Sequence, residues 1–361
     1  MTLPATLREA EGRIASRPVA AGLALFAVLA VAAFLGALAI GPFAIAPGRV
    51  LAILADWVVG APAPASTLRE RIVVLDVRFP RAVLGVLAGA GMAVAGALMQ
   101  GVFRNPLADP SLVGVAPGAA LAAVAFVVFG APVAALLPPQ LQAVGLPLAA
   151  FAGGLVTTLV IARLAERDGR TSVATLLFAG LALGALASAG TGVMVFLASE
   201  QQTRDFLFWT LGSLGGATWM KAALAAPFVL GLLMVAARLA RGLDALALGE
   251  AEAFHAGVAV ERLKRVAVVA VAAGVGAAVA AAGVVGFVGL MVPHLARLVV
   301  GPSHRGLLPA SALLGAAVLL GADILARMIA APAELPLGVV TALVGAPFFL
   351  WLLLQRRAFV G

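Results

Sequence analysis

Apolar residues run along this chain in blocks of about 20, and short polar segments separate the blocks. A helix of about 20 apolar residues spans the roughly 30 Å of hydrocarbon in a bilayer. A β-barrel would instead alternate polar and apolar residues over about ten positions, so the pattern excludes one. The sequence therefore predicts an all-α polytopic membrane protein of about ten transmembrane helices. These spans lie near residues 19–41, 80–102, 113–129, 142–163, 172–198, 219–238, 266–284, 286–300, 306–329 and 336–354.

The most informative interruption lies at residues 103–118, where three prolines, an asparagine and two charges stand between two apolar spans. Such a cluster costs too much to expose to lipid, so it must emerge into water or line a path enclosed by protein. We therefore expect a tight turn between the second and third spans. The topology below puts this turn on the cytoplasmic face, near an inner gate and a partner contact.

Composition and charge placement support an integral membrane protein with both termini in the cytoplasm. Hydrophobic residues make up 63% of the chain and charged residues 11%, against about a quarter charged in a soluble domain. The net charge of +8 comes from 22 Arg and two Lys. With the N-terminus inside, sixteen of these fall on the cytoplasmic side and eight on the other, as the positive-inside rule requires. The excess of positive charge is therefore explained by the ends of the helices at the membrane surface, and no nucleic-acid partner is expected.

The first apolar run also has a feature of a secretory signal, since Ala44 and Ala46 resemble a small-residue cleavage site. However, Pro47 would follow the cut, and residues 19–41 are longer than a typical signal core. We interpret this run as an uncleaved first helix.

The chain predicts one transmembrane domain, residues 1–361, that contains a large cytoplasmic loop at 239–265. Within this loop, residues 243–248 and 250–256 form two short helical patterns, each followed by a glycine, Gly249 and Gly257. Two short helices at the membrane face would make a surface for a cytoplasmic partner.

Motifs for covalent chemistry are absent from the sequence. No P-loop is present, so the chain cannot bind ATP in one, and no hydrolase or zinc-protease motif occurs. There is no cysteine, and the three histidines lack metal-ligand spacing. The chain is therefore not expected to be an enzyme or to hold a metal or a fixed haem. A membrane-embedded enzyme would need a clustered His, Asp or Glu constellation.

Membrane carboxylates are scarce as well. Asp323 is the main one, and Arg327 follows four residues later, the spacing at which two side chains pair on one helix face. A secondary transporter driven by protons or sodium would need a chain of such acids. Their scarcity points to an energy source on a separate ATPase subunit.

Several ordered motifs run through most of the chain and carry a family resemblance. The main ones are RFPR at 78–81, GALMQG at 96–101, RNPLADP at 104–110, GFVGL at 286–290, ADILAR at 322–327 and GAPFF at 345–349. With these motifs the chain resembles the permease subunits of type II ABC importers, the group that takes up iron-siderophores, haem and cobalamin. The resemblance implies a homodimer in the bacterial inner membrane, two cytoplasmic ABC ATPases that bind ATP and Mg, and a periplasmic substrate-binding protein.

The resemblance also assigns roles to residues. It implies that Arg78, Arg81 and Arg327 dock the binding protein; headgroup anchoring, or for Arg327 pairing with Asp323, is the alternative. Thr171 and Ser172 would form a cytoplasmic gate, with ordinary N-capping as an alternative that is compatible with it. Glu200 and Arg204 would lie on a possible external path, where Arg204 meets an anionic ligand or is a plain loop charge. The residues expected at the ATPase coupling surface are Leu243, Leu246, Gly249, Glu250, Glu252, Phe254 and Gly257.

The cargo is less strongly marked than the family. The stretches at 170–177, 208–219 and 257–265 look most like the haem-importing branch. Haem is therefore the expected substrate, and no cofactor is expected to stay on the chain. A ferric siderophore or cobalamin remains the alternative cargo, and an ATP-independent secondary transporter is the alternative mechanism.

Overall fold

The computed structural model describes residues 5–60, 67–136, 138, 142–167 and 169–357. In this part of the chain each of the ten predicted spans coincides with a helix, which confirms the predicted fold class. By length and composition, seven stretches are apolar and long enough to cross a membrane, and α5, α14 and α16 are shorter apolar helices. The ten helices are α1 (Ala5–Ala39), α4 (Phe79–Phe103), α5 (Val115–Phe129), α8 (Gly145–Ala165), α9 (Val173–Leu197), α11 (Trp219–Leu246), α13 (Val260–Ala282), α14 (Val288–Val300), α15 (His304–Ile329) and α16 (Leu337–Arg357).

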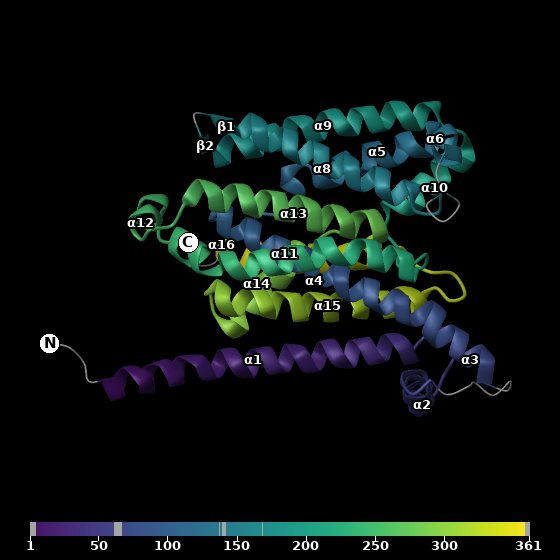
Figure 1. Ribbon diagram of the computed structural model, residues 1–361, viewed down its shortest axis with the longest axis horizontal. Helices are drawn as coiled ribbons and strands as arrows, with labels where there is room; N and C mark the ends of the chain where they lie inside the picture. The colour runs from purple at the N-terminus through teal and green to yellow at the C-terminus, as the bar shows by residue number, and fades with distance from the viewer. Residues whose placement is uncertain (1–4, 61–66, 137, 139–141, 168, 358–361) are drawn as a thin grey trace.

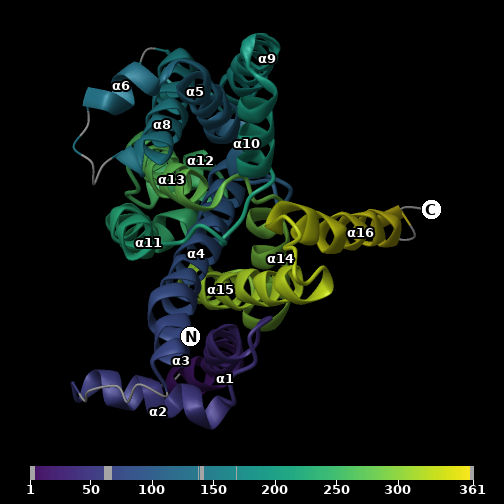
Figure 2. The same ribbon diagram turned by 90° about the vertical axis from the view of Figure 1, so that its right-hand side faces the viewer.

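The helices pack side by side in layers, as Figure 1 shows. Helices α5, α8 and α9 form one outer layer, and α1 lies at the opposite margin beside α15. Between them, α4 crosses the middle of the bundle and packs against α11, α13, α14 and α15. Helix α16 leaves the bundle sideways in the view of Figure 2. The core is therefore built around α4.

Glycines let α4 approach its neighbours at backbone distance. A Cβ on Gly89 would overlap the carbonyl oxygen of Gly315 in α15, and a Cβ on Gly96 would overlap the carbonyl oxygen of Gly289 in α14. Such close packing is the usual source of helix association in membranes, where no hydrophobic force acts between helices. The glycine-rich pattern of this span therefore serves contacts within one chain.

The helix around α4 begins earlier than the sequence predicted. A span starting near residue 80 was expected, but α3 (Leu68–Ile72) and the π-helical segment η2 (Val73–Arg78) lead into α4 without a break. Pro80 stands in the first turn of α4, where a missing N–H is tolerated. Before α3, helix α2 (Pro47–Val58) lies beside the end of α1, and residues 61–66 between α2 and α3 lie outside the described residues.

The predicted cytoplasmic loop at 239–265 is mostly helical, which corrects the expected pair of short helices. Residues 243–246 continue α11, because Leu243 and Leu246 extend the buried stripe of Ala236 and Ala240. The second short helix is confirmed as α12 (Glu250–His255). It ends in a Schellman motif, since Val258 N–H donates to Ala253 and Gly257 N–H to Phe254, with φ of +83° at Gly257.

The polar turn predicted at 103–118 is confirmed. Arg104 ends α4 in the left-handed conformation, with φ of +49°. The Asn105 side chain then accepts from Leu107 N–H at 2.9 Å, and Asp109 accepts from Ser111 N–H at 2.8 Å at the start of the 3₁₀ helix η3 (Pro110–Val113). Local side-chain bonds of this kind compete with helix and stabilise turns.

The remaining elements are short and lie at the two ends of the bundle. Helices α6 (Ala131–Leu136) and α10 (Glu200–Thr210) lie at the same end as α2 in Figure 1. At the other end, beside α12, the strands β1 (Glu166–Arg167) and β2 (Arg170–Thr171) form an antiparallel pair with Glu166 opposite Thr171. We call these the α2 end and the α12 end.

The close approach of α4 predicts a strong effect of one added methyl group. We expect Gly96→Ala to destabilise the protein by about 2 kcal/mol, because overpacking forces backbone shifts. The check is the thermal unfolding midpoint of the purified protein in detergent. Gly321→Ala in α15 is the matched control, since nothing lies within 4 Å of its new Cβ; it should be neutral or stabilising. Equal midpoints for both variants would contradict the packing argument.

Candidate functional site

Two clusters of buried charge lie at opposite ends of the bundle. The arginine cluster, at the α2 end, consists of Arg78, Arg81, Asp323, Arg327 and Glu334. The lysine cluster, at the α12 end, consists of Thr171, Glu250, Glu261 and Lys264. Among the described residues no group of three or more His, Asp or Glu side chains is placed to hold a metal ion. The contacts within both clusters are ion pairs and hydrogen bonds.

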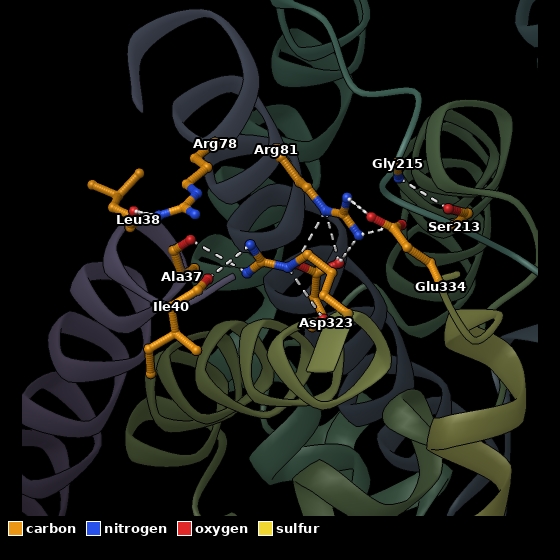
Figure 3. A network of polar contacts seen from close by, with 10 residues as sticks. Ala37, Leu38, Ile40, Arg78, Arg81, Ser213, Gly215, Asp323 and Glu334 are labelled. Atoms are coloured by element: carbon orange, nitrogen blue, oxygen red, sulfur yellow. Dashed lines mark hydrogen bonds and ion pairs between the residues drawn. The ribbon is translucent and has the colours of Figure 1, made fainter. Parts of the chain in front are cut away.

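Arg81, in the first turn of α4, is the centre of the arginine cluster (Figure 3). Its guanidinium donates to Asp323 of α15 from Nη2 at 2.8 Å and from Nε at 3.0 Å. It also donates to both oxygens of Glu334, from Nη1 and Nη2, each at 2.8 Å. An arginine presents its five N–H donors in a fixed planar fork that matches carboxylate oxygens. Bidentate ion pairs of this geometry are stronger than hydrogen bonds between neutral groups. Arg81 thus joins α4, α15 and the segment before α16.

The other two arginines hold the C-terminal end of α1. Arg78 donates to the carbonyl oxygens of Leu38 at 2.7 Å and Ala39 at 2.8 Å, and also to that of Phe43. Arg327 donates to Ile40 at 3.0 Å and Ala37 at 3.3 Å, and pairs with Asp323 at 3.1 Å. The last carbonyls of a helix lack partners within it and carry partial negative charge. These guanidinium groups supply the missing donors.

Glu334 is the most accessible member of the cluster, with 36% of its side chain exposed. It lies between α15 and α16, outside the spans, and hydrogen bonds from Arg81 hold the pKa of its carboxyl below the ordinary value. Just after it, Leu337 N–H donates to Gly212 and Gly338 N–H donates to Leu211, each at 2.9 Å. The start of α16 is thus tied both to Arg81 and to the segment that follows α10.

The predicted pairing of Asp323 with Arg327 is confirmed. All three predicted docking arginines are buried, each with less than 10% of its surface exposed, and their docking role stays a prediction. Sequence reasoning missed the bonds from Arg81 to Asp323 and Glu334. The acidic residue in the motif at 334–338 was a signal for the second, but no spacing rule joins residues about 250 positions apart.

Lys264 is the centre of the lysine cluster, and only 2% of its side chain is exposed. Its Nζ donates to Glu250 at 2.8 Å, to Glu261 at 3.3 Å and to the carbonyl oxygen of Thr171 at 3.3 Å. The other carboxylate oxygen of Glu261 accepts from Thr171 N–H at 2.6 Å. Sequence reasoning counted Lys264 only as one of the cytoplasmic charges and missed its burial.

The structure brings the predicted gate next to the predicted coupling helix. Thr171 ends β2 and is buried, and its Oγ1 lacks a hydrogen-bond partner. Ser172 N-caps α9 by accepting from Thr175 N–H at 3.2 Å, which confirms the predicted capping. Lys264 on α13 joins Glu250 to the carbonyl oxygen of Thr171, the residue before Ser172.

The predicted coupling residues differ in exposure. Leu243 and Leu246 are buried in the last turns of α11, whereas Phe254 is 70% exposed on α12. Glu252 is also exposed, and its carboxylate lies against Gly249, which has a φ of +138° and N-caps α12. The surface offered to a partner therefore consists of α12 and not of the end of α11.

The predicted external residues Glu200 and Arg204 belong to α10, a separate helix opened by a capping box of Ser199 and Gln202. Both side chains are exposed, and they pair weakly at 4.0 Å. Exposed pairs of this kind contribute little stability, so these charges are free to meet other groups.

Two further sets of contacts join the ends of helices at the α12 end. Arg297 of α14 donates to the Gln100 side chain of α4 at 2.9 Å. Asp244 of α11 accepts from Ser303 Oγ at 2.9 Å and from His304 N–H at 2.7 Å, so it caps the start of α15. These bonds join helices that the sequence separates by 59 residues or more.

Comparisons with known proteins agree with this architecture. Residues 28–355 match the FecCD transport family. The chain is 45% identical to the hemin transport system permease protein of Yersinia pestis, over 78% of this chain and 83% of that protein. It is 40% identical to the cobalamin import system permease protein of Halobacterium salinarum, over 97% of this chain and 99% of that protein. It is 39% identical to the Fe(3+) dicitrate transport system permease protein of Escherichia coli K12, over 85% of this chain and 90% of that protein.

One solved structure is similar in fold as well. It is an inward-facing conformation of a metal-chelate type ABC transporter, with a TM-score of 0.79 and 28% identity, covering 92% of this chain and 98% of that one.

The arginine cluster predicts that one carboxylate is essential for stability. We expect Asp323→Asn to cost about 3–5 kcal/mol, because it leaves Arg81 and Arg327 buried without their shared acid. The measurement is thermal unfolding in detergent. Glu70→Gln is the control, since Glu70 pairs with Arg49 at the same end but is about a third exposed, and its loss should cost less than about 1 kcal/mol. A similar small loss for both variants would contradict the argument.

Proposed function

The chain belongs to the FecCD transport family, and from this premise we propose that it is the permease subunit of an ATP-driven haem importer. Haem would pass from the outer to the inner face by alternating access, and ATP hydrolysis would occur on separate chains. The observation that carries the proposal is the family match over residues 28–355, together with 45% identity to a hemin permease. Neither haem nor ATP and Mg would remain on this chain as a cofactor.

Haem is favoured over the other cargoes by identity, since the cobalamin and ferric dicitrate relatives are 40% and 39% identical. Cobalamin is the second candidate, because that relative matches 97% of this chain. A large, mostly apolar macrocycle suits a path lined by Ala, Leu and Val.

We further propose that two copies of this chain form the pathway. Helix α9 has only Leu176, Gly180 and Ala187 buried, and its Phe178 and Phe196 are 72% and 86% exposed. Leu343 and Leu350 of α16 are 69% and 62% exposed, and this helix projects sideways from the bundle (Figure 2). Lipid covers such faces in part, and a second copy would cover the rest.

The two ends of the bundle suit the two expected soluble partners. The arginine count supports a chain in the bacterial inner membrane with the α12 end and both termini on the cytoplasmic side. There α12, whose Phe254 is exposed, and the exposed Leu248 just before it would fit an ABC ATPase, one for each copy. The α2 end would then face the periplasm and the binding protein.

At the α2 end, docking would use the charge that the arginine cluster has in excess. Three guanidinium groups face two carboxylates there. Arg81 is the member best placed to meet an acidic side chain of the binding protein, because its partner Glu334 reaches the surface. Charge pairs at a wet interface steer docking and fix orientation.

Reconstitution with the ATPase and the binding protein tests the proposed function. In proteoliposomes we expect ATP-dependent uptake of haem, well above that of ferric dicitrate or cobalamin measured in the same way. Uptake by this chain without ATP would contradict the proposal and favour a secondary transporter. Faster uptake of cobalamin would make cobalamin the substrate.

The docking role of Arg81 has its own test, the affinity of the binding protein for the permease in nanodiscs. Arg81→Gln should lower this affinity and flatten its dependence on salt, because one charge pair is lost. Arg49→Gln is the control, since Arg49 is a less buried arginine at the same end. The same affinity at every salt concentration, in a variant that elutes as a folded dimer, would count against docking at Arg81.

A further inference from the structure

Lys264 connects two segments that the proposed function needs to move together. We propose that it is a positioning residue that transmits displacement of α12 to Thr171 and Ser172, the residues that lead into α9. This inference rests on the proposed function, because it requires an ATPase that acts on α12.

The ammonium group of Lys264 is shared by three separate segments. Lys264 lies in the second turn of α13 and is almost fully buried. Its three protons are directed to Glu250 at the start of α12, to Glu261 one turn earlier on α13, and to the carbonyl oxygen of Thr171 in β2. A lysine has three donors, so each donor is used on a different segment.

A buried lysine is a costly way to hold helices together. Removing an ammonium group from water costs several kcal/mol, and apolar residues of similar volume often stabilise as well as a buried ion pair. What the charge adds is directional contact, since the ammonium group of Lys264 would be penalised if it were buried without its partners. The pairing therefore favours one relative position of α12, β2 and α13 over others.

The segment before α9 is held at its backbone and not only by side chains. Thr171 donates its N–H to Glu261 at 2.6 Å, and its carbonyl oxygen accepts from Lys264. A more exposed pair, Arg265 with Glu166 at 3.4 Å, adds a contact between α13 and β1. Because the next residue, Ser172, caps α9, a shift of Thr171 displaces the start of that helix.

On the other side, Glu250 is placed to receive a push on α12. It is the first residue of the helix and follows Gly249, whose φ of +138° suits only glycine. Phe254, one turn later on the same side of the helix, is exposed to solvent. A partner that presses on this exposed side moves Glu250, and the 2.8 Å ion pair carries the movement to Lys264.

Helix α9, which begins at this segment, makes few buried contacts within its own chain. Only three residues of α9 are buried, whereas fifteen of α13 are. A displacement at the lysine cluster therefore moves α9 more easily than it moves α13. Lys264 would link closure of the ATPase to the proposed gate residues, Thr171 and Ser172, through its bonds to Glu250 and to the carbonyl oxygen of Thr171.

The test uses the complete complex with its ATPase and binding protein, with haem as the probe. Lys264→Met keeps the length of the side chain and removes the charge, and Lys264→Arg restores a charge. Arg262→Met is the matched control, since Arg262 is an exposed cation two residues away on a different face of α13. We measure ATP hydrolysis and haem uptake together, and we follow the gate by maleimide labelling of Arg170→Cys. The chain has no cysteine of its own, so within this chain the label reports position 170 only.

We expect Lys264→Met to hydrolyse ATP but to import about 5- to 100-fold less haem per ATP, the range of ordinary coupling energies. ATP should no longer change the labelling rate at position 170. Lys264→Arg should recover part of both, and Arg262→Met should match the wild type. A merely structural role would lower hydrolysis and uptake together and leave their ratio unchanged, which would overturn the proposal.

Glu250→Gln provides a second variant at a half-exposed position that tolerates the change, if Lys264→Met does not fold. It should lower the same ratio, and a wild-type ratio would overturn the proposal. If Lys264→Met and Glu250→Gln both fold, the double variant should import no less haem per ATP than the more impaired single variant, because both substitutions remove the same contact. If the wild-type complex itself imports no haem under ATP, the proposed function fails, and the labelling of Arg170→Cys with ATP still tests the linkage.

Discussion

Close backbone contact around α4 is the constraint on which the rest of the structure depends. Gly89 meets Gly315 and Gly96 meets Gly289 at distances that no side chain permits. Where two helix backbones touch, neither can slide or rotate without a clash, so the relation of α4 to α14 and α15 is rigid. Both polar ends of the bundle are built on this rigid part. Arg78 and Arg81 lie at the start of α4, and Gln100 and Arg104 lie at its end.

The two charge clusters use the same physics for different purposes. At the α2 end, three guanidinium groups face two carboxylates, and carbonyl oxygens at the end of α1 accept hydrogen bonds from Arg78 and Arg327. Most of these partners come from elements packed on α4, so the cluster strengthens a part that is already rigid. At the α12 end one ammonium group faces two carboxylates, and its partners come from a short helix and a two-stranded turn. A charge shared among lightly packed segments controls their positions more than it adds stability.

The sequence predicted what depends on composition and local spacing. Ten apolar blocks became ten helices because a long apolar helix is the only simple way to satisfy a backbone in lipid. The Asp323–Arg327 pair followed from a spacing of four, and Ser172 from its place before an apolar run. Arg81 with Asp323 did not follow, because residues 242 positions apart meet only through the packing of α4 on α15. Lys264 shows the same limit, since a lysine near a helix start reads as a cytoplasmic charge until three segments close over it. The continuation of α11 to Leu246 was missed because its buried stripe depends on contact with other helices.

Rigidity at the centre also decides which part of the molecule can respond to a partner. Helices α4, α14 and α15 are locked by glycine contacts, so a push at the α12 end cannot be absorbed by shearing them. Helix α13 packs on both α4 and α8 and has most of its length buried, so it serves as a fixed support. The layer of α5, α8 and α9 has no comparable tie to α15, and α9 is its most exposed member. Displacement of the start of α9 is therefore the movement at the lysine cluster that costs the least free energy. Under the proposed function, such a permease would keep its core intact and change access through one outer helix.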